Sequence, residues 1–229
     1  MPLVKKYPSR VTKTGNPLEG LYDVTLESLG RSYSYLPGQF LHLALDTYDP
    51  SSPWPESRCF SMRSAAASGS IRLTFAVKGN FTRRMAAELL PGKEVVVKLP
   101  YGELFSRAHD RARTVFIAGG TGVVPFLSLF SDPSFDVYEN PCLWLGVREE
   151  RYHIYGAELQ DARKRNMSFH VHTVCQDREG VLDIAKIFSN HGQAATYFIS
   201  GPPIMIKGFR DYLLAHGLTA EQVCTDDWE

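Results

Sequence analysis

The chain has 229 residues, of which 44% are hydrophobic, and its 25 Lys and Arg balance its 25 Asp and Glu. This length suffices for one large domain or for two of roughly 100 to 120 residues, each with its own core. A formal charge of zero without a basic tract argues against nucleic acid and anionic membranes as partners. A small-molecule partner is therefore expected.

The first residues and the cysteines predict a cytoplasmic protein. The opening "MPLVKKYPSR" lacks the apolar core of a secretory signal, and no apolar run approaches the roughly 18 residues that a membrane span needs. The cysteines lie far apart, so no CxxC pair exists to hold zinc or an iron-sulfur cluster; they are Cys59, Cys142, Cys175 and Cys224. Reduced, mostly buried thiols and no metal are expected.

Up to about Phe105, short β-rich runs are separated by turn sequences. The runs are "LYDVTLESL", "QFLHLAL", "SIRLTFAVK" and "KEVVVKLP". Their spacing predicts an antiparallel barrel or sandwich. One helix is predicted inside this region, at residues 81–90, and is ended by Pro91 and Gly92.

After the polar segment 106–113, strand-length apolar runs alternate with helical patterns. The strands are "RTVFIAG", "PCLWLGV", "MSFHVHTV" and "TYFIS", and the helices are "VPFLSLF", "YGAELQDARKR", "VLDIAKIFS" and "MIKGFRDYLLAHG". This alternation predicts a parallel α/β domain. The boundary is expected near His109, so that residues 1–108 and 109–229 form separate domains.

A glycine turn joins the first of these strands to its helix. Residues 119–122 read "GGTG", and Pro125 follows near the first helical turn. A bare backbone at this point lets a phosphate approach the start of the helix, as in dinucleotide sites. Glycine turns also close strand-helix units for packing reasons alone, and the sequence leaves both interpretations open.

Four motifs in chain order resemble the ferredoxin-NADP reductase superfamily of flavin reductases, over nearly the whole chain. They are "RCFS" (58–61), "GNFT" (79–82), "GGTG" (119–122) and "SGPPIM" (200–205). The resemblance implies an N-terminal antiparallel Greek-key β-barrel that binds FAD and a C-terminal Rossmann-like α/β domain with a parallel sheet that binds NAD(P). It further implies an FAD-dependent NAD(P)H oxidoreductase.

In that family the first two motifs hold the flavin. By resemblance, Arg58 pairs with the flavin phosphates, Phe60 replaces the usual Tyr against the isoalloxazine, and Ser61 reaches flavin N5 as a catalytic group. Thr82 serves as a phosphate donor or as a helix cap alone. A helix start here favours FAD over FMN. The expected flavin-binding residues are Arg58, Cys59, Phe60, Ser61, Val77, Gly79, Phe81 and Thr82.

The last two motifs are expected to hold the nicotinamide nucleotide. Ser200 stands where the family has a Cys beside the nicotinamide, which makes it a second catalytic candidate. Mixed charge pairs, Arg148 with Glu149 and Asp177 with Arg178, follow the second and third strands and favour NADPH over NADH only slightly. The expected nucleotide-binding residues are Gly120, Thr121, Gly122, Pro125, Arg148, Arg178, Gly201 and Pro202.

Trp228, near the end of the chain, is the last candidate. The family often places a terminal aromatic ring over the flavin, so Trp228 is expected to be a catalytic lid that contacts FAD; the alternatives are a disordered tail or a Trp that anchors the terminus to the surface.

The acceptor is expected to be a separate molecule, such as a ferredoxin, a flavodoxin, a ferric chelate, a quinone or an oxygenase partner. Two alternatives remain: an electron-transfer subunit of a larger oxidoreductase or oxygenase complex, and a non-catalytic binding module. The lack of a cysteine-rich segment counts against a subunit that carries an iron-sulfur cluster.

Overall fold

The computed structural model describes residues 3–226. The chain divides into two compact units, the first ending at Glu103 and the second beginning at Leu104. The sequence placed this boundary between residues 108 and 109. The assignment of FAD to the first unit and of the nicotinamide nucleotide to the second stays a prediction.

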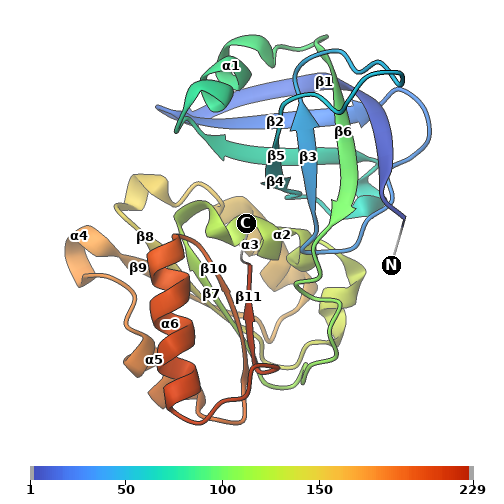
Figure 1. Ribbon diagram of the computed structural model, residues 1–229. Coiled ribbons are helices and arrows are strands. Elements are labelled where there is room, and N and C mark those ends of the chain that lie inside the picture. Colours follow the sequence, from blue (N-terminus) through green and yellow to red (C-terminus); the bar gives the residue numbers. More distant parts are fainter. Residues whose placement is uncertain (1–2, 227–229) are drawn as a thin grey trace. The chain divides into compact units, whose positions relative to one another are not determined.

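The first unit is built on a six-stranded antiparallel sheet, in the order β4-β3-β6-β1-β2-β5 (Figure 1). Its elements are β1 (Lys5–Leu18), β2 (Leu21–Ser28), β3 (Phe40–Ala44), β4 (Ser57–Ser61), β5 (Ser70–Ala76), α1 (Asn80–Glu88) and β6 (Glu94–Tyr101). The barrel-like antiparallel sheet confirms the predicted fold of this half. The "RCFS" and "GNFT" motifs belong to β4, one end of the sheet order, and to the start of α1, which follows the other end, β5.

Helix α1 is the predicted helix of this half. Phe81 and Met85 are one turn apart and are both buried in the core of the unit, which makes α1 amphipathic. The helix ends at Glu88, two residues before the predicted end at Leu90.

The second unit is a five-stranded parallel sheet in the order β11-β10-β7-β8-β9 (Figure 1). Its strands are β7 (Thr114–Gly119), β8 (Cys142–Val147), β9 (His170–Cys175), β10 (Thr196–Ser200) and β11 (Val223–Thr225). Its helices are α2 (Val124–Phe130), α3 (Gly156–Arg165), α4 (Gln176–Glu179), α5 (Ile184–His191) and α6 (Pro203–Ala215). The predicted Rossmann-like half is confirmed.

Successive side chains of this sheet belong to two separate hydrophobic cores. In β7, Phe116 and Ala118 belong to the core that also contains residues of α2 and α3, whereas Val115 and Ile117 belong to the core shared with α5 and α6. Because successive residues of a strand point to opposite faces, helices cover both sides of the sheet. Ligands of such folds bind at the carboxyl ends of the strands, where the strand order reverses.

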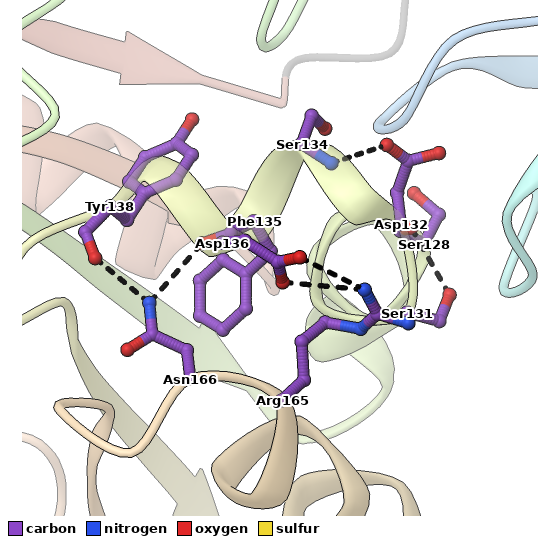
Figure 2. Close-up of polar contacts among 9 residues, drawn as sticks. All are labelled: Ser128, Ser131, Asp132, Ser134, Phe135, Asp136, Tyr138, Arg165 and Asn166. Carbon is purple, nitrogen blue, oxygen red and sulfur yellow. Dashed lines mark hydrogen bonds and ion pairs between the residues drawn. The ribbon is translucent and has the colours of Figure 1, made fainter.

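A buried amide fixes the connection that follows α2. Asn166, at the end of α3, donates from Nδ2 to the carbonyl oxygens of Phe135 and Tyr138, at 3.2 and 2.8 Å (Figure 2). These carbonyls belong to the end of a short 3-10 helix, η3 (Pro133–Val137). The ion pair between Arg165 and Asp136, 3.3 Å long, lies beside them at the surface. The amide therefore supplies a donor to the Tyr138 carbonyl and a second donor to the Phe135 carbonyl, which already accepts the Tyr138 N–H at 3.2 Å.

Within residues 3–226, none of the helices combines the length and the apolar composition that a bilayer crossing demands. All four cysteines are free thiols, and Cys142, Cys175 and Cys224 are buried, as expected.

Candidate functional site

In the first unit, the candidate site lies on β4 and the start of α1. The Arg58 guanidinium lies over the ring of Phe81, 5.1 Å from its centroid, so two residues from different motifs are brought together. Arg58 Nη2 also donates to Glu56 Oε1 at 2.8 Å, and its side chain is 53% exposed. A guanidinium this exposed retains donors for a phosphate.

The start of α1 is shaped by Gly79 and Thr82. Thr82 Oγ1 accepts hydrogen bonds from the backbone N–H groups of Lys78 and Gly79, at 2.9 and 3.1 Å, and donates to the Gly79 carbonyl. The capping role of Thr82 is thus present in the structure, and its role as a phosphate donor stays a prediction. A Cβ added to Gly79 would meet no atom within 4 Å, so the approach to the first helical amides is open.

Strand β4 divides its residues between two faces. Phe60 packs edge-on against Phe75, with ring centroids 6.2 Å apart, on the core side. Cys59 alternates to the other side, where its sulfur lies 3.5 Å from His42 Nε2. Burial raises the pKa of the Cys59 thiol. The cofactor roles of Cys59, Phe60, Ser61 and Val77 stay predictions; Ser61 ends β4, and Val77 follows β5, where its N–H donates to the Gly20 carbonyl at 2.8 Å.

In the second unit, the "GGTG" and "SGPP" turns interlock at the carboxyl ends of adjacent strands. A Cβ on Gly122 would collide with the Ser200 carbonyl oxygen and lie 2.6 Å from the Gly201 Cα. A Cβ on Gly119 would lie 2.7 Å from Pro202 Cδ, and one on Gly201 would lie 2.9 Å from the Gly119 nitrogen. Packing, one of the two interpretations left open, therefore accounts for these three glycines.

Gly120 differs from its neighbours. Its φ is +55°, which favours glycine, and a Cβ there would meet nothing within 4 Å. Residues Gly120–Val123 form a 3-10 turn, η2, that runs directly into α2, where Pro125 is buried and Thr121 precedes it on the exposed side. Gly120 and Thr121 therefore present the accessible backbone of this turn.

Ser200 is buried and hydrogen-bonded to an acidic residue that sequence reasoning missed. Its Oγ lies 3.1 Å from Asp226 Oδ2, and Asp226 itself is only 8% exposed. The contact arises because β11 runs parallel to β10, which brings the Asp226 N–H to the Ile199 carbonyl at 3.0 Å. The acidic "TDD" after residue 224 was the available signal. Trp228, the predicted lid, lies outside the described residues.

The two predicted arginines have different surroundings. Arg178 Nη2 donates to Glu150 Oε2 at 2.7 Å and to Cys175 Sγ at 3.3 Å. Arg148 is exposed, and the ion pairs found in residues 3–226 do not include it. The structure therefore does not bring Arg148 and Arg178 together by a direct contact.

These surfaces have the donors and the open backbone that nucleotide phosphates require. The chemistry of the donor set suits a pyrophosphate in the first unit, where an exposed guanidinium and an open helix start lie on neighbouring elements. In the second unit, the two turns follow β7 and β10, between which the strand order reverses. This is the place where a dinucleotide crosses such a sheet.

Comparisons with known proteins agree with this geometry. Residues 116–211 match the family described as "Oxidoreductase NAD-binding domain". In Yersinia enterocolitica, one component of the Na(+)-translocating NADH-quinone reductase is 27% identical over 157 residues, which is 61% of this chain and 38% of that protein. The corresponding component of the Mannheimia succiniciproducens enzyme is 26% identical over 156 residues, with the same coverage. The chain thus spans well under half of the curated relatives it matches.

Solved structures share the fold of the whole chain. A ferredoxin NADP+ reductase from Neisseria gonorrhoeae, solved with FAD and NADP, superposes with a TM-score of 0.78 at 17% identity, over 97% of this chain and 96% of that one. The flavohem-like FAD/NAD binding domain of a nitric oxide dioxygenase from Vibrio cholerae superposes with a TM-score of 0.75 at 15% identity, over 97% and 98%. These superpositions show that the chain has the two-unit fold of these structures, the fold that the four motifs led us to expect.

Proposed function

We propose that the protein is an FAD-dependent NAD(P)H oxidoreductase that passes electrons from a nicotinamide nucleotide to a separate acceptor. The observation that carries the proposal is the accessible backbone of Gly120 and Thr121 at the switch point of the parallel sheet, within a segment that matches an oxidoreductase NAD-binding family. FAD, when bound, accepts a hydride from the nicotinamide and releases electrons singly or in pairs.

In the first unit, the protein's own residues bind and orient the flavin. Arg58 neutralises the pyrophosphate, and the amides at the start of α1 donate to it past Gly79. The half-buried Phe60 supports the ring system from the core side, and Ser61 supplies a hydroxyl at the end of β4.

In the second unit, the residues position the nicotinamide nucleotide. The exposed backbone of Gly120 and Thr121 receives the pyrophosphate, and Gly201 and Pro202 line the other side of the switch point. Ser200, held by Asp226, presents a fixed hydroxyl at the end of β10. Catalysis of this kind rests mainly on holding two reacting rings in contact while water is excluded.

A second candidate is favoured by the curated relatives, which are subunits of a larger NADH-quinone reductase. In that case the chain acts as the nucleotide-oxidising part of an assembly, and its acceptor is a redox centre of a partner. Ferredoxins, flavodoxins, quinones and ferric chelates are the acceptors to test. A cytoplasmic location also stays a prediction from the sequence.

The test is anaerobic titration of the purified protein. We expect a yellow protein that releases FAD, and not FMN, on denaturation, and whose visible flavin absorbance bleaches on addition of NADH or NADPH. A colourless protein that fails to bind added FAD would contradict the proposal. Steady-state reduction of an acceptor panel, with and without candidate partners, separates the independent enzyme from the component of an assembly.

A further inference from the structure

A pocket opens at the carboxyl ends of β8 and β9. It has a volume of about 400 Å³ and is lined by Glu150, His153, Thr173, Cys175, Arg178 and Glu179. The glycine turn follows β7 at the same edge of the sheet, with β8 between β7 and β9. Two strand spacings amount to about 10 Å, which is within reach of the adenosine ribose of a dinucleotide whose pyrophosphate lies at the turn.

The charges of the pocket are two carboxylates against one guanidinium. Arg178 is already engaged, because its Nη2 atom donates to Glu150 Oε2 at 2.7 Å and to Cys175 Sγ at 3.3 Å. Glu179 is held in place, because its Oε1 accepts the backbone N–H of Cys175 at 3.1 Å. The lining therefore carries an excess of negative charge. Neither the Glu150 nor the Glu179 side chain can rotate out of the pocket without losing a hydrogen bond.

One lining residue also lacks a partner. His153 Nε2 is buried and forms no hydrogen bond within the described part of the chain. A buried ring nitrogen without a partner is uncommon, and a ligand hydroxyl or amine in the pocket would satisfy it.

We propose that this pocket takes an adenosine ribose with a free 2′-hydroxyl and thereby makes the protein select NADH over NADPH; the inference rests on the proposed function. The carboxylates accept a hydrogen bond from the hydroxyl and repel a 2′-phosphate. The exposed ion pair between Arg178 and Glu150 is weak, so Arg178 does not cancel the negative charge of the pocket. The discrimination between NADH and NADPH therefore comes from the two carboxylates, which outnumber the single guanidinium. The slight preference for NADPH expected from the sequence is thereby reversed.

The first test compares kcat/KM for NADH and NADPH in the holoprotein. We expect NADH to be favoured by about tenfold or more, the scale on which one charged contact separates two ligands. Glu150→Gln frees Arg178 and should raise kcat/KM for NADPH by about tenfold, and it should lower kcat/KM for NADH because one acceptor of the 2′-hydroxyl is weakened. Glu149→Gln is the matched control, because Glu149 pairs with Arg151 at 2.9 Å and does not line the pocket.

The second test measures ligand binding alone and does not depend on hydride transfer. Calorimetric titration of the full chain with 5′-AMP and with adenosine 2′,5′-bisphosphate should show tighter binding of AMP, and Glu150→Gln should narrow the difference. Tighter binding of the bisphosphate, binding of neither ligand, or an equal shift from Glu149→Gln would each overturn the inference. If AMP binds as expected but neither nucleotide reduces the flavin, the proposed function fails and the pocket assignment stands.

Discussion

The Ser200 hydroxyl donates a hydrogen bond to the Asp226 carboxylate across two parallel strands, 3.1 Å from oxygen to oxygen. Both residues are buried, at 3% and 8% exposure. A buried carboxylate requires donors, and a hydroxyl that donates to it is held in one orientation. The pair therefore fixes the direction of the Ser200 lone pairs at the proposed nicotinamide position.

Removing this donor should destabilise the protein. We expect Ser200→Ala to lower the free energy of unfolding by about 1.5 to 3 kcal/mol, the usual contribution of a hydrogen bond to a charged group. Ser200→Cys retains a weak donor and should cost less. Urea unfolding of both variants provides the measurement, and equal stability of Ser200→Ala and the parent would show that the contact is not formed.

Arg58→Ala should release the flavin. The pyrophosphate would lose its guanidinium, at a cost of about 2 to 5 kcal/mol in binding free energy. Occupancy is measured as the ratio of flavin to protein absorbance after gel filtration. Arg10→Ala is the control, because Arg10 forms an exposed ion pair with Glu94 on other strands of the same sheet. Full FAD occupancy in Arg58→Ala would remove Arg58 from the site.

The two glycines of the "GGTG" turn should respond differently to alanine. Gly122→Ala places a Cβ against Ser200 and Gly201 and should destabilise the protein by about 1 to 3 kcal/mol through overpacking, with a loss of nicotinamide affinity because both turns move. Gly120→Ala meets no atom but carries a φ of +55°, so only conformational strain of about 1 to 2 kcal/mol is expected.

Thermal unfolding and nucleotide titration of the two glycine variants measure these effects. Flavin occupancy should be unchanged in both. A Gly122→Ala variant with normal stability and normal nucleotide affinity would contradict the interlocking of the turns.

Acidification should weaken the second unit through His191. Trp144 Nε1 donates to His191 Nε2 at 3.0 Å, which requires that nitrogen to be unprotonated. Burial, with a smaller contribution from His172, lowers the pKa of His191 below its ordinary 6.5. The unfolded chain then binds the proton more readily, so stability present above pH 6.5 is lost as the pH falls towards the lower folded value.

Urea midpoints between pH 7.5 and 5 test this expectation. His191→Gln should flatten the pH dependence, whereas His170→Gln, on the exposed side of β9, should leave it unchanged. An identical slope in His191→Gln and the parent would assign the pH dependence to other groups, among them His109 and His42, whose pKa values burial also lowers.

Asn166 should matter far more than the ion pair beside it. Asn166→Leu removes the amide donor of the Tyr138 carbonyl and one of the two donors of the Phe135 carbonyl, and should cost about 2 kcal/mol of unfolding free energy (Figure 2). Arg165→Ala breaks the nearby pair with Asp136 and should cost about 1 kcal/mol or less. Chemical denaturation should separate the two variants clearly, and equal costs would contradict the role of the amide.

The sequence predicted those strands whose pattern reflects burial. In β2, Val24 and Leu26 alternate with less buried residues, so the two-residue period of the sequence indicated a strand. In β7 nearly every residue is buried, and the short length of the apolar run indicated a strand. Strand β1 was missed because it contains Pro8 and Pro17 and is mostly exposed. It forms nonetheless because it pairs with β2 and β6 on its two sides.

The sequence was sufficient to predict the motifs of the candidate site. It was not sufficient to predict which residues of these motifs are in contact. The "GGTG" pattern does not reveal that Gly122 faces Gly201, because this contact depends on the parallel pairing of β7 with β10. Asp226 was missed because β11 has only three residues, too few for a periodic pattern.

The contact between the two glycine turns constrains how nucleotide sites of this kind can be re-engineered. Exchange of one turn for that of a relative would set foreign side chains against Gly119, Gly122 or Gly201, where even a methyl group has no room. The two turns lie about eighty residues apart in the chain, but because they are in contact they must be exchanged together. The pocket at the ends of β8 and β9 contains none of these three glycines, so its residues can be exchanged one at a time to test the proposed coenzyme preference.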